Sequence, residues 1–381
     1  MANNNENKVL NVPHLRFPEF NGEWETKLIN DLAVVIGGGT PDTTIKSYWD
    51  GEIQWFTPSE IGKNKYVDSS LRTITEDGLN NSSAKRLPPN TILLSSRATI
   101  GECSLSLREC ATNQGFQSLV SKKCYVDFLY YLIQTKKRDL IRKSCGSTFL
   151  EISANEVRKI QVSVPTDVEQ QKIAGLLSLI DERIATQNKI IEDLKKLKSA
   201  IRKKMFSLLK DEYTESFEIN QLLDYEQPTA YIVANDEYST DTSLTPVLTA
   251  NKGFILGYTD EKFGIYQKGE CIIFDDFTMD AKYVSFPFKV KSSAIKILTA
   301  KPNVNLRFMF EYLSYWELKS EEHKRHYISE IASLVIELPS KERQSIIASL
   351  MTSLNSKLDI EAKTKIRYEE QKRYLLSQMF I

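Results

Sequence analysis

The stretch PTDVEQQKIAG at residues 165–175 returns in altered form as PSKERQSIIAS at residues 339–349, 174 residues later. In each copy a proline is followed by Thr166 or Ser340, a residue type that favours the N-cap position of a helix. Glu169 follows Thr166 at the spacing of a capping box, and Arg343 holds the matching position of the second copy. Both stretches therefore predict the start of a helix.

The similarity extends over fifty positions without a gap when residues 157–206 are aligned with residues 331–380. Alternating apolar residues before each proline predict a short, half-buried strand that the proline ends. Matching positions include Val157 and Ile331, Ile160 and Leu334, Val162 and Ile336, Pro165 and Pro339, Gln170 and Gln344, and Met205–Phe206 and Met379–Phe380. The chain is therefore predicted to be an internal repeat of two half-units.

Each proline is followed by about 40 residues that contain no further proline and a single glycine, Gly175. A helix of that length is about 60 Å long. Apolar residues recur in two interleaved sets of period seven, interrupted by polar residues such as Glu361 and Lys365, which is the pattern of a coiled-coil seam. One such segment is typical of a helix that lies on a core, but two matched copies favour an antiparallel coiled coil. The residues predicted for this seam or for a subunit interface are Ile173, Leu177, Ile180, Ile184, Ile191, Leu194, Ile347, Met351, Leu354, Leu358 and Leu375.

The regions before the two helices, residues 14–156 and 212–330, resemble each other much less. Both contain short β-rich runs separated by Gly, Asn and Pro turns, and then a helical stretch. The predicted class is α+β: two mixed domains joined by two long antiparallel coiled-coil helices, in a pseudo-two-fold internal repeat. The predicted boundaries are 1–164 for the first domain, 165–211 for its long helix, 212–338 for the second domain and 339–381 for its long helix.

The composition is that of a globular protein, with 41% apolar and 26% charged residues and no apolar run long enough to span a membrane. The N-terminal residues MANNNENKVLNVP hold no apolar stretch of the kind that secretory signals need. Five cysteines without a C-x-x-C pair are typical of reduced thiols. A cytoplasmic location is therefore expected.

Motifs for catalysis are missing. The glycine-rich GGGTP at residues 37–41 lacks the G-K-[ST] ending of a phosphate-binding loop and predicts a turn, and no G-x-G-x-x-G is present. His323 and His326 could share a helix face, but the sequence offers no third ligand near them, so no metal site is predicted. No catalytic residue is predicted either.

Local basic groups interleaved with aromatic and amide side chains are the candidates for binding. Arg, Asn and Gln read base edges, whereas Lys and Arg hold phosphates. Fifty basic residues balance fifty acidic ones, so any DNA contact must rest on local patches or on a partner's charge. Each patch by itself is also typical of a solvated surface. The candidate DNA-contact residues are Lys63, Lys65, Lys85, Arg86, Arg97, Asn113, Gln114, Lys282 and Tyr283.

Residues 183–204 carry eight basic and two acidic side chains. This excess is compatible with contact to a polyanion, contact to an acidic partner, or simple exposure along the coiled coil.

A strand, the pattern P-x-x-x-[ER]-Q and a long heptad helix ending in Met-Phe, all present twice, closely resemble the specificity subunit of type I restriction–modification enzymes. The stretch HLRFPEF at residues 14–20 with Trp24 is similar to that family's sequences, as is SSRATIG at 95–101 with TNQGF at 112–116. The resemblance spans the chain and is most specific in the helices.

This resemblance implies that each variable region is a target recognition domain that reads one half of a bipartite, asymmetric double-stranded DNA target. The helix pair would set the unread spacer and dock two modification (methyltransferase) subunits. S-adenosylmethionine, ATP and magnesium would then be bound by modification and restriction subunits, with no cofactor and no catalysis on this chain. A coiled-coil scaffold with protein-binding end domains and no DNA function is the alternative. A single sequence sets neither the bases read nor the spacer length.

Overall fold

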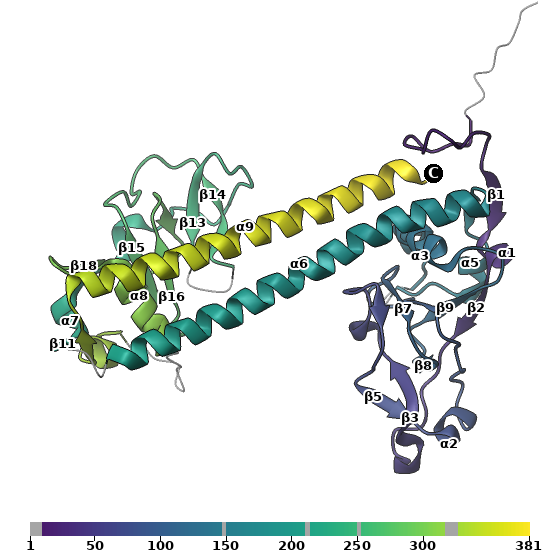
Figure 1. Ribbon diagram of the computed structural model, residues 1–381, viewed down its shortest axis with the longest axis horizontal. Coiled ribbons are helices and arrows are strands. Elements are labelled where there is room, and N and C mark those ends of the chain that lie inside the picture. The colour runs from purple at the N-terminus through teal and green to yellow at the C-terminus, as the bar shows by residue number, and fades with distance from the viewer. Residues whose placement is uncertain (1–9, 147–149, 210–213, 250–252, 317–326) are drawn as a thin grey trace, which may run out of the picture. The chain divides into compact units, whose positions relative to one another are not determined.

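The computed structural model describes residues 10–146, 150–209, 214–249, 253–316 and 327–381, and its elements are labelled in Figure 1. The chain divides into two compact units, one made of residues 1–189 with 362–381 and the other of residues 190–361. Two long helices, α6 (Asp167–Leu208) and α9 (Lys341–Met379), each contribute one part to both units. Within the described residues, no helix has the length and apolar character needed to cross a membrane.

The first unit places its strands in three sheets. A five-stranded sheet has the order β2-β9-β6-β7-β4, a three-stranded sheet has the order β5-β3-β8, and β1 pairs with β10. The strands are β1 (Glu25–Leu28), β2 (Ala33–Gly37), β3 (Trp49–Phe56), β4 (Tyr66–Val67), β5 (Arg72–Ile74), β6 (Ile92–Leu94), β7 (Cys103–Ser106), β8 (Cys110–Thr112), β9 (Gln117–Ser121) and β10 (Gln161–Val164).

Short helices connect and cover these sheets. They are α1 (Ile29–Leu32), the 3-10 turns η1 (Lys46–Tyr48) and η2 (Pro58–Glu60), α2 (Glu76–Asn80), α3 (Val126–Thr135), α4 (Lys137–Arg142) and α5 (Ala154–Arg158). The main core of the unit joins α3 to the five-stranded sheet and to both long helices, and it includes Phe128, Leu177, Met379 and Phe380. The three-stranded sheet has its own smaller core around Trp49 and Trp55.

The second unit repeats the arrangement with different strands. Its sheets have the orders β12-β18-β15-β16 and β14-β13-β17, and β11 pairs with β19. The strands are β11 (Glu215–Glu218), β12 (Leu223–Glu226), β13 (Thr245–Leu248), β14 (Ile255–Thr259), β15 (Cys271–Asp275), β16 (Ala281–Val284), β17 (Lys289–Val290), β18 (Ile295–Ala300) and β19 (Val335–Leu338). The other elements are α7 (Ile219–Leu222), the 3-10 turn η4 (Pro228–Tyr231), α8 (Leu306–Tyr315) and the π-helical turn η5 (Tyr327–Ile331).

The strand predicted before each proline is confirmed, and it pairs with the first strand of its own domain. Glu25 lies opposite Val164 in the antiparallel pair β1–β10, and Glu215 lies opposite Leu338 in β11–β19. Each domain therefore closes on itself one residue before the proline that precedes the long helix.

The repeated glutamine of the helix-start pattern ties this closure to the domain's central helix. Gln170 donates its side-chain N–H to the Pro165 carbonyl at 3.0 Å and accepts the Tyr125 backbone N–H at 2.9 Å. Gln344 donates to the Pro339 carbonyl and accepts the Asn305 backbone N–H, both at 2.9 Å. Tyr125 and Asn305 are the N-cap residues of α3 and α8. One buried amide thus fixes a strand end and the starts of two helices in each unit.

The two copies differ at the position of the predicted capping box. Both carboxylate oxygens of Glu169 accept from the Arg16 guanidinium, at 2.7 and 2.8 Å, and Glu169 is fully buried. Arg16 also donates to the carbonyls of Gly22 and Asn21, so this ion pair fastens the N-terminal segment to the start of α6. In the second copy the Ser340 hydroxyl accepts the Arg343 backbone N–H at 3.3 Å, as an N-cap does.

The long helices run antiparallel within each unit. In the first unit Asp181 pairs with Lys372 at 2.8 Å, while Arg183, further along α6, lies over the ring of Tyr368, which is earlier in α9. In the second unit, Phe206 near the end of α6 and Ile347 near the start of α9 share one core.

The predicted seam residues follow a gradient of burial along the helices. Those nearest the domain cores are buried, and those further from the cores are half-buried. The buried ones are Ile173, Leu177, Ile180, Ile347, Met351 and Leu375, and the half-buried ones are Ile184, Ile191, Leu194, Leu354 and Leu358.

Candidate nucleic-acid interface

The glycine-rich segment after β2 is packed tightly between two other loops of the first unit. A Cβ atom on Gly38 would lie 2.0 Å from the Asn113 carbonyl oxygen, and one on Gly39 would lie 2.3 Å from the Ala84 nitrogen. Only glycine allows so close an approach. The segment therefore brings the loop of Asn113 and Gln114 next to the loop that leads to Lys85 and Arg86. The glycines predicted to form a turn allow these two loops to pack closely against the segment.

Two tryptophans of β3 donate hydrogen bonds to the backbone of this segment. The Trp55 indole N–H donates to the Gly39 carbonyl at 3.0 Å, and the Trp49 indole N–H donates to the Asp42 carbonyl at 3.1 Å. The Arg72 guanidinium lies 3.5 Å from the centre of the Trp49 ring, a cation–π contact across β3 and β5. No pattern in the sequence singles out Arg72 as a partner of these rings.

The predicted amide pair lies at this loop cluster with its orientation fixed. The exposed Gln114 accepts a hydrogen bond from the Thr40 hydroxyl, and the Asn113 side-chain oxygen accepts the Gly115 backbone N–H at 2.8 Å. A hydrogen bond to the amide oxygen fixes the direction in which the NH2 group, a donor, points.

Arg97 lies on a neighbouring segment. Ser96 donates its backbone N–H to the Gly115 carbonyl at 2.8 Å, so the stretches SSRATIG and TNQGF lie side by side. The Arg97 guanidinium pairs with Glu151 at 2.8 Å and is half-buried. Five predicted contact residues therefore come from adjacent segments of one unit: Lys85, Arg86, Arg97, Asn113 and Gln114.

Some of the basic side chains predicted to contact DNA are paired with carboxylates of the same unit. Arg86 lies between Glu76 and Glu109, and these two hydrogen-bonded carboxylates raise the pKa of its guanidinium. Lys65 lies 2.5 Å from Asp127 and donates to the Ser178 hydroxyl of α6 at 2.7 Å, with its side chain only 6% exposed. Lys65 thus connects the domain to its long helix and presents no exposed charge to a phosphate. The neighbouring Lys63 and the more distant Lys85 are exposed.

In the second unit the predicted pair lies on β16. Lys282 and Tyr283 are both half-buried. The Arg307 guanidinium of α8 lies 3.5 Å from the centre of the Tyr283 ring, and burial raises the pKa of the phenol. The charge and ring stacked here belong to Arg307 and Tyr283, and no signal in the sequence marks Arg307 beyond its place in a helical stretch.

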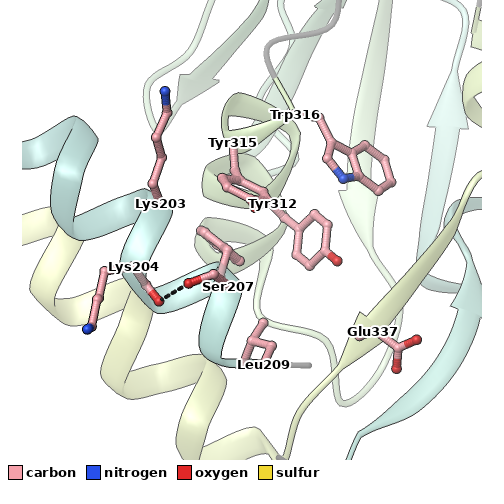
Figure 2. Close-up of a pocket in the computed structure, with 9 residues that line it drawn as sticks. Lys203, Lys204, Ser207, Leu209, Tyr312, Tyr315, Trp316 and Glu337 are labelled. Atoms are coloured by element: carbon pink, nitrogen blue, oxygen red, sulfur yellow. Dashed lines mark hydrogen bonds between the residues drawn. The ribbon is translucent and has the colours of Figure 1, made fainter. Parts of the chain in front are cut away.

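A pocket of about 700 Å³ in the second unit takes in part of the basic run 183–204, as Figure 2 shows. Lys203 and Lys204 of α6 form one side, and Tyr315 and Trp316 at the end of α8 form another. Phe206 stacks on Tyr315 with ring centres 5.2 Å apart. The aromatic wall therefore serves to hold the end of α6 on its domain.

Metal binding finds no support in the described residues, which include no group of three His, Cys, Asp or Glu side chains placed to hold an ion. The two histidines weighed for a helix face, His323 and His326, lie outside the described residues.

Comparison with known protein families decides what this arrangement is. The family model for the type I restriction modification DNA specificity domain matches residues 21–196 and again residues 212–370. The chain belongs to this family. The two matches coincide with the two copies of the repeat, each containing one mixed domain and most of one long helix. Membership favours the specificity-subunit hypothesis over a coiled-coil scaffold without a DNA function.

Named relatives are type I restriction enzyme specificity subunits. The MjaIX subunit of Methanocaldococcus jannaschii is 38% identical over 216 residues, which cover 55% of this chain and 50% of the relative. The EcoR124I/EcoR124II subunit of Escherichia coli is 39% identical over 178 residues, or 42% of this chain and 43% of the relative. The chain thus spans about half the length of these two relatives. The EcoprrI subunit of Escherichia coli is 23% identical over 84% of both chains.

Solved structures confirm the predicted fold. The S subunit of a type I restriction–modification system from M. genitalium superposes with a TM-score of 0.64 over 97% of this chain and 99% of that chain, at 17% identity. A chain from a structural study of complex assembly and conformational transition in the type I restriction–modification system gives a TM-score of 0.58 over 95% of this chain and 98% of that chain, at 13% identity.

Proposed function

We propose that this chain is the DNA-recognition subunit of a type I restriction–modification complex. Each α+β domain reads one half of a bipartite target, and the two halves differ because the two domains differ. The observation that carries the proposal is the double match of the DNA specificity domain, once in each copy of the repeat. The chain itself is a non-catalytic subunit.

In the first unit the proposed reading surface is the loop cluster around Gly38 and Gly39. Gln114 and Asn113 supply oriented amides, and the exposed Lys85 supplies a charge for a phosphate. Lys63 is a further exposed candidate for the DNA backbone. In the second unit the proposed contacts are Lys282 and Tyr283 on β16, next to the stacked Arg307.

Two modification subunits are proposed to dock on the long helices. Several apolar side chains of these helices stay exposed outside the seam, including Leu179, Leu197, Ile346 and Ile360, and these are surfaces that a partner helix would cover. The partner subunits would bring S-adenosylmethionine for adenine methylation, and restriction subunits would bring ATP and magnesium. The length of the helix pair is proposed to set the unread spacer between the half-sites.

The test is selection from a random double-stranded DNA library by the chain reconstituted with its modification subunits. The expected result is one motif with two unlike halves separated by a fixed number of unread base pairs. Sequencing of methylated adenines in a host that carries the same subunits should recover the same motif. Selection of no gapped motif would refute DNA recognition and favour the scaffold hypothesis. A complex of the modification subunits without this chain is the control.

A further inference from the structure

The two units hold their domains on the long helices through matching polar positions. The central helix of each domain, α3 or α8, is ten residues long and starts at the N-cap bound by Gln170 or Gln344. The sixth residue of that helix is Tyr131 in the first unit and Glu311 in the second. Both side chains are fully buried from solvent and reach the long helices.

Tyr131 meets a carboxylate on the long helix. Its hydroxyl donates to Asp181 of α6 at 2.6 Å, and the other oxygen of Asp181 pairs with Lys372 of α9 at 2.8 Å. Asp181 and Lys372 are 15% and 18% exposed, so both charges are largely withdrawn from water. We call Tyr131, Asp181 and Lys372 the first junction cluster.

The second junction cluster is Glu311 with Asn355, Lys198 and Arg202. The first three hold positions that match those of the first cluster, whereas the position that matches Arg202 is Leu376. Asn355 and Lys198 are related to Asp181 and Lys372 by the same shift of 174 residues that defines the repeat. Here the carboxylate belongs to the domain helix. Both oxygens of Glu311 are used: one accepts Arg202 at 2.7 and 2.9 Å, and the other accepts the Asn355 amide at 3.4 Å.

Lys198 completes the second cluster. Burial lowers the pKa of its ammonium group, and the negative charge of Glu311 acts in the opposite direction. The two clusters thus share three positions, one of them a lysine, but place the single central carboxylate on opposite partners, α6 in the first unit and α8 in the second.

Exchanging the domains would leave charges uncompensated at both junctions. Glu311 brought against Asp181 would set two carboxylates side by side out of water. Tyr131 brought against Asn355 would leave Lys198 and Arg202 without their carboxylate. Removing one partner from a buried ion pair leaves an unpaired buried charge, which destabilises strongly, and such mismatches are how specific interfaces reject wrong partners.

We infer that the junction clusters form a pair of keyed interfaces, each of which accepts its own domain and rejects the domain of the other half. The competing structure that they exclude is the domain of one repeat packed on the helix ends of the other, in the same chain or in a second copy. Where the proposed function holds, the keying also fixes which half-site is read at which end of the helix pair.

The test transplants the charge pattern of the first unit into the second by two isosteric substitutions in the full chain. Glu311→Gln removes the carboxylate from α8, Asn355→Asp adds one to α9, and the double variant carries both changes. Each single variant is expected to lower the thermal midpoint of the second unit by about 4 °C or more. Each should also speed hydrogen exchange of α8 amides by a factor on the order of ten or more.

The double variant should recover most of both losses, because Asn355 contacts Glu311, so a carboxylate introduced at position 355 restores one negative charge to the cluster that holds Lys198 and Arg202. Glu370→Gln, an exposed change of the same chemistry, is the control and should change neither readout.

Losses that simply add in the double variant would overturn the inference, since the two positions would then be energetically independent. If a single variant does not fold, recovery of folded protein in the double variant supports the keyed interface, and failure of the double variant overturns it. The readouts need no DNA, so they are unaffected by the outcome of the DNA-selection experiment.

Discussion

Gln170 and Gln344 each have a buried side-chain amide that makes two hydrogen bonds to the backbone. The NH2 group donates to a proline carbonyl, and the oxygen accepts the N–H of the residue that caps the domain's central helix. Sequence alignment of the two copies marks these residues as matching, but it gives no reason why glutamine is needed. The hydrogen bonds supply that reason, because the amide must accept at one end and donate at the other. A glutamate could not donate to the proline carbonyl.

Replacing either glutamine by alanine should destabilise its own unit. Gln170→Ala leaves the Tyr125 N–H and the Pro165 carbonyl without their partner, and Gln344→Ala does the same to Asn305 and Pro339. We expect a loss of about 2–4 kcal/mol in the free energy of unfolding for each, measured by urea denaturation. Gln371→Ala, at an exposed position of α9, is the matched control and should change stability little. Equal effects of all three variants would contradict this role.

The oriented amide of Gln114 should act on one half-site only. In the reconstituted complex, Gln114→Ala should relax the preference at one or two base pairs of a single half-site by about 5- to 150-fold and leave the other half-site intact. Arg97→Ala and Lys282→Ala should weaken binding, and loss confined to one half-site would mark a base reader. A uniform loss for Gln114→Ala across all sequences would instead indicate a contact with the DNA backbone. Binding to a library of single-base variants of the target distinguishes these outcomes.

Buried thiols make the protein sensitive to alkaline pH. Burial raises the pKa of Cys103 and of Cys271 from 9.0 to about 12. The folded state then keeps protons that the unfolded state loses, so the stabilisation is complete below about pH 9 and falls as pH rises towards 12. The expected slope is about 1.4 kcal/mol per pH unit for each such thiol.

Urea midpoints measured from about pH 8.5 to about pH 10.5 should show a smaller slope for Cys103→Ala than for the parent chain. Cys145→Ala, at an exposed site, should keep the parent slope. A profile that stays flat to about pH 11 would contradict this.

The site residues were less predictable than the helices. Residue type and neighbours in the sequence mark Lys65 as a phosphate contact, but its partners Asp127 and Ser178 come from segments 62 and 113 residues away. Arg72 stacks on Trp49 and Arg307 stacks on Tyr283, and no local sequence pattern predicts such pairs. Gln114 could be proposed from the sequence because amides among basic groups are a chemical signal that needs no tertiary context, and its role in DNA binding stays a prediction.

At the scale of elements, the long helices carry two kinds of surface. Their ends belong to the domain cores, where Leu177, Met351 and Met379 are fully or almost fully buried. Further along, the apolar seam residues are half-buried, and the polar side chain of Gln187 between them is buried. The heptad pattern predicted both regions alike, since periodicity records which face turns inward and not how much other structure covers it.

Alanine substitutions should reveal this gradient. Met351→Ala removes a fully buried side chain and should cost about 2–4 kcal/mol, whereas Leu358→Ala, seven residues further along the same seam, should cost about half as much. The same order is expected for Leu177→Ala and Leu194→Ala on α6. Urea denaturation of the four variants measures these differences. Costs that do not fall from core to mid-seam would show that the half-buried seam is as tightly packed as the domain cores.

At the scale of the whole molecule, the repeat was the most predictable feature, because fifty gap-free positions need no tertiary information to be seen. The class, α+β with two long antiparallel helices, followed from it. The arrangement of strands did not, since β3 pairs with both β5 and β8 through connections that no short-range pattern specifies.

The proposed spacer role of the helices predicts the effect of shortening them together. Deleting residues 187–193 and the matching 361–367 removes one heptad, or about 10 Å, from each helix. At about 3.4 Å per base pair, the unread spacer should shorten by about three base pairs while both half-sites stay the same. Replacing the two heptads by other heptads of equal length is the control and should keep the spacing. Library selection with an unchanged spacer in the shortened chain would refute this role.

The first unit is built from two separate stretches of the chain, and this affects when its core can form during synthesis. Phe380 stacks on Phe128 and packs edge-on against Trp24, so the core of that unit includes residues from both 1–189 and 362–381. A ribosome produces residues 362–381 only after every residue of the second unit. The nascent first domain therefore holds an open aromatic site that the chain fills late, and the second unit can finish folding before the first. Domains usually fold in the order of their synthesis; here the core of the first unit can be completed only after all residues of the second unit have been made.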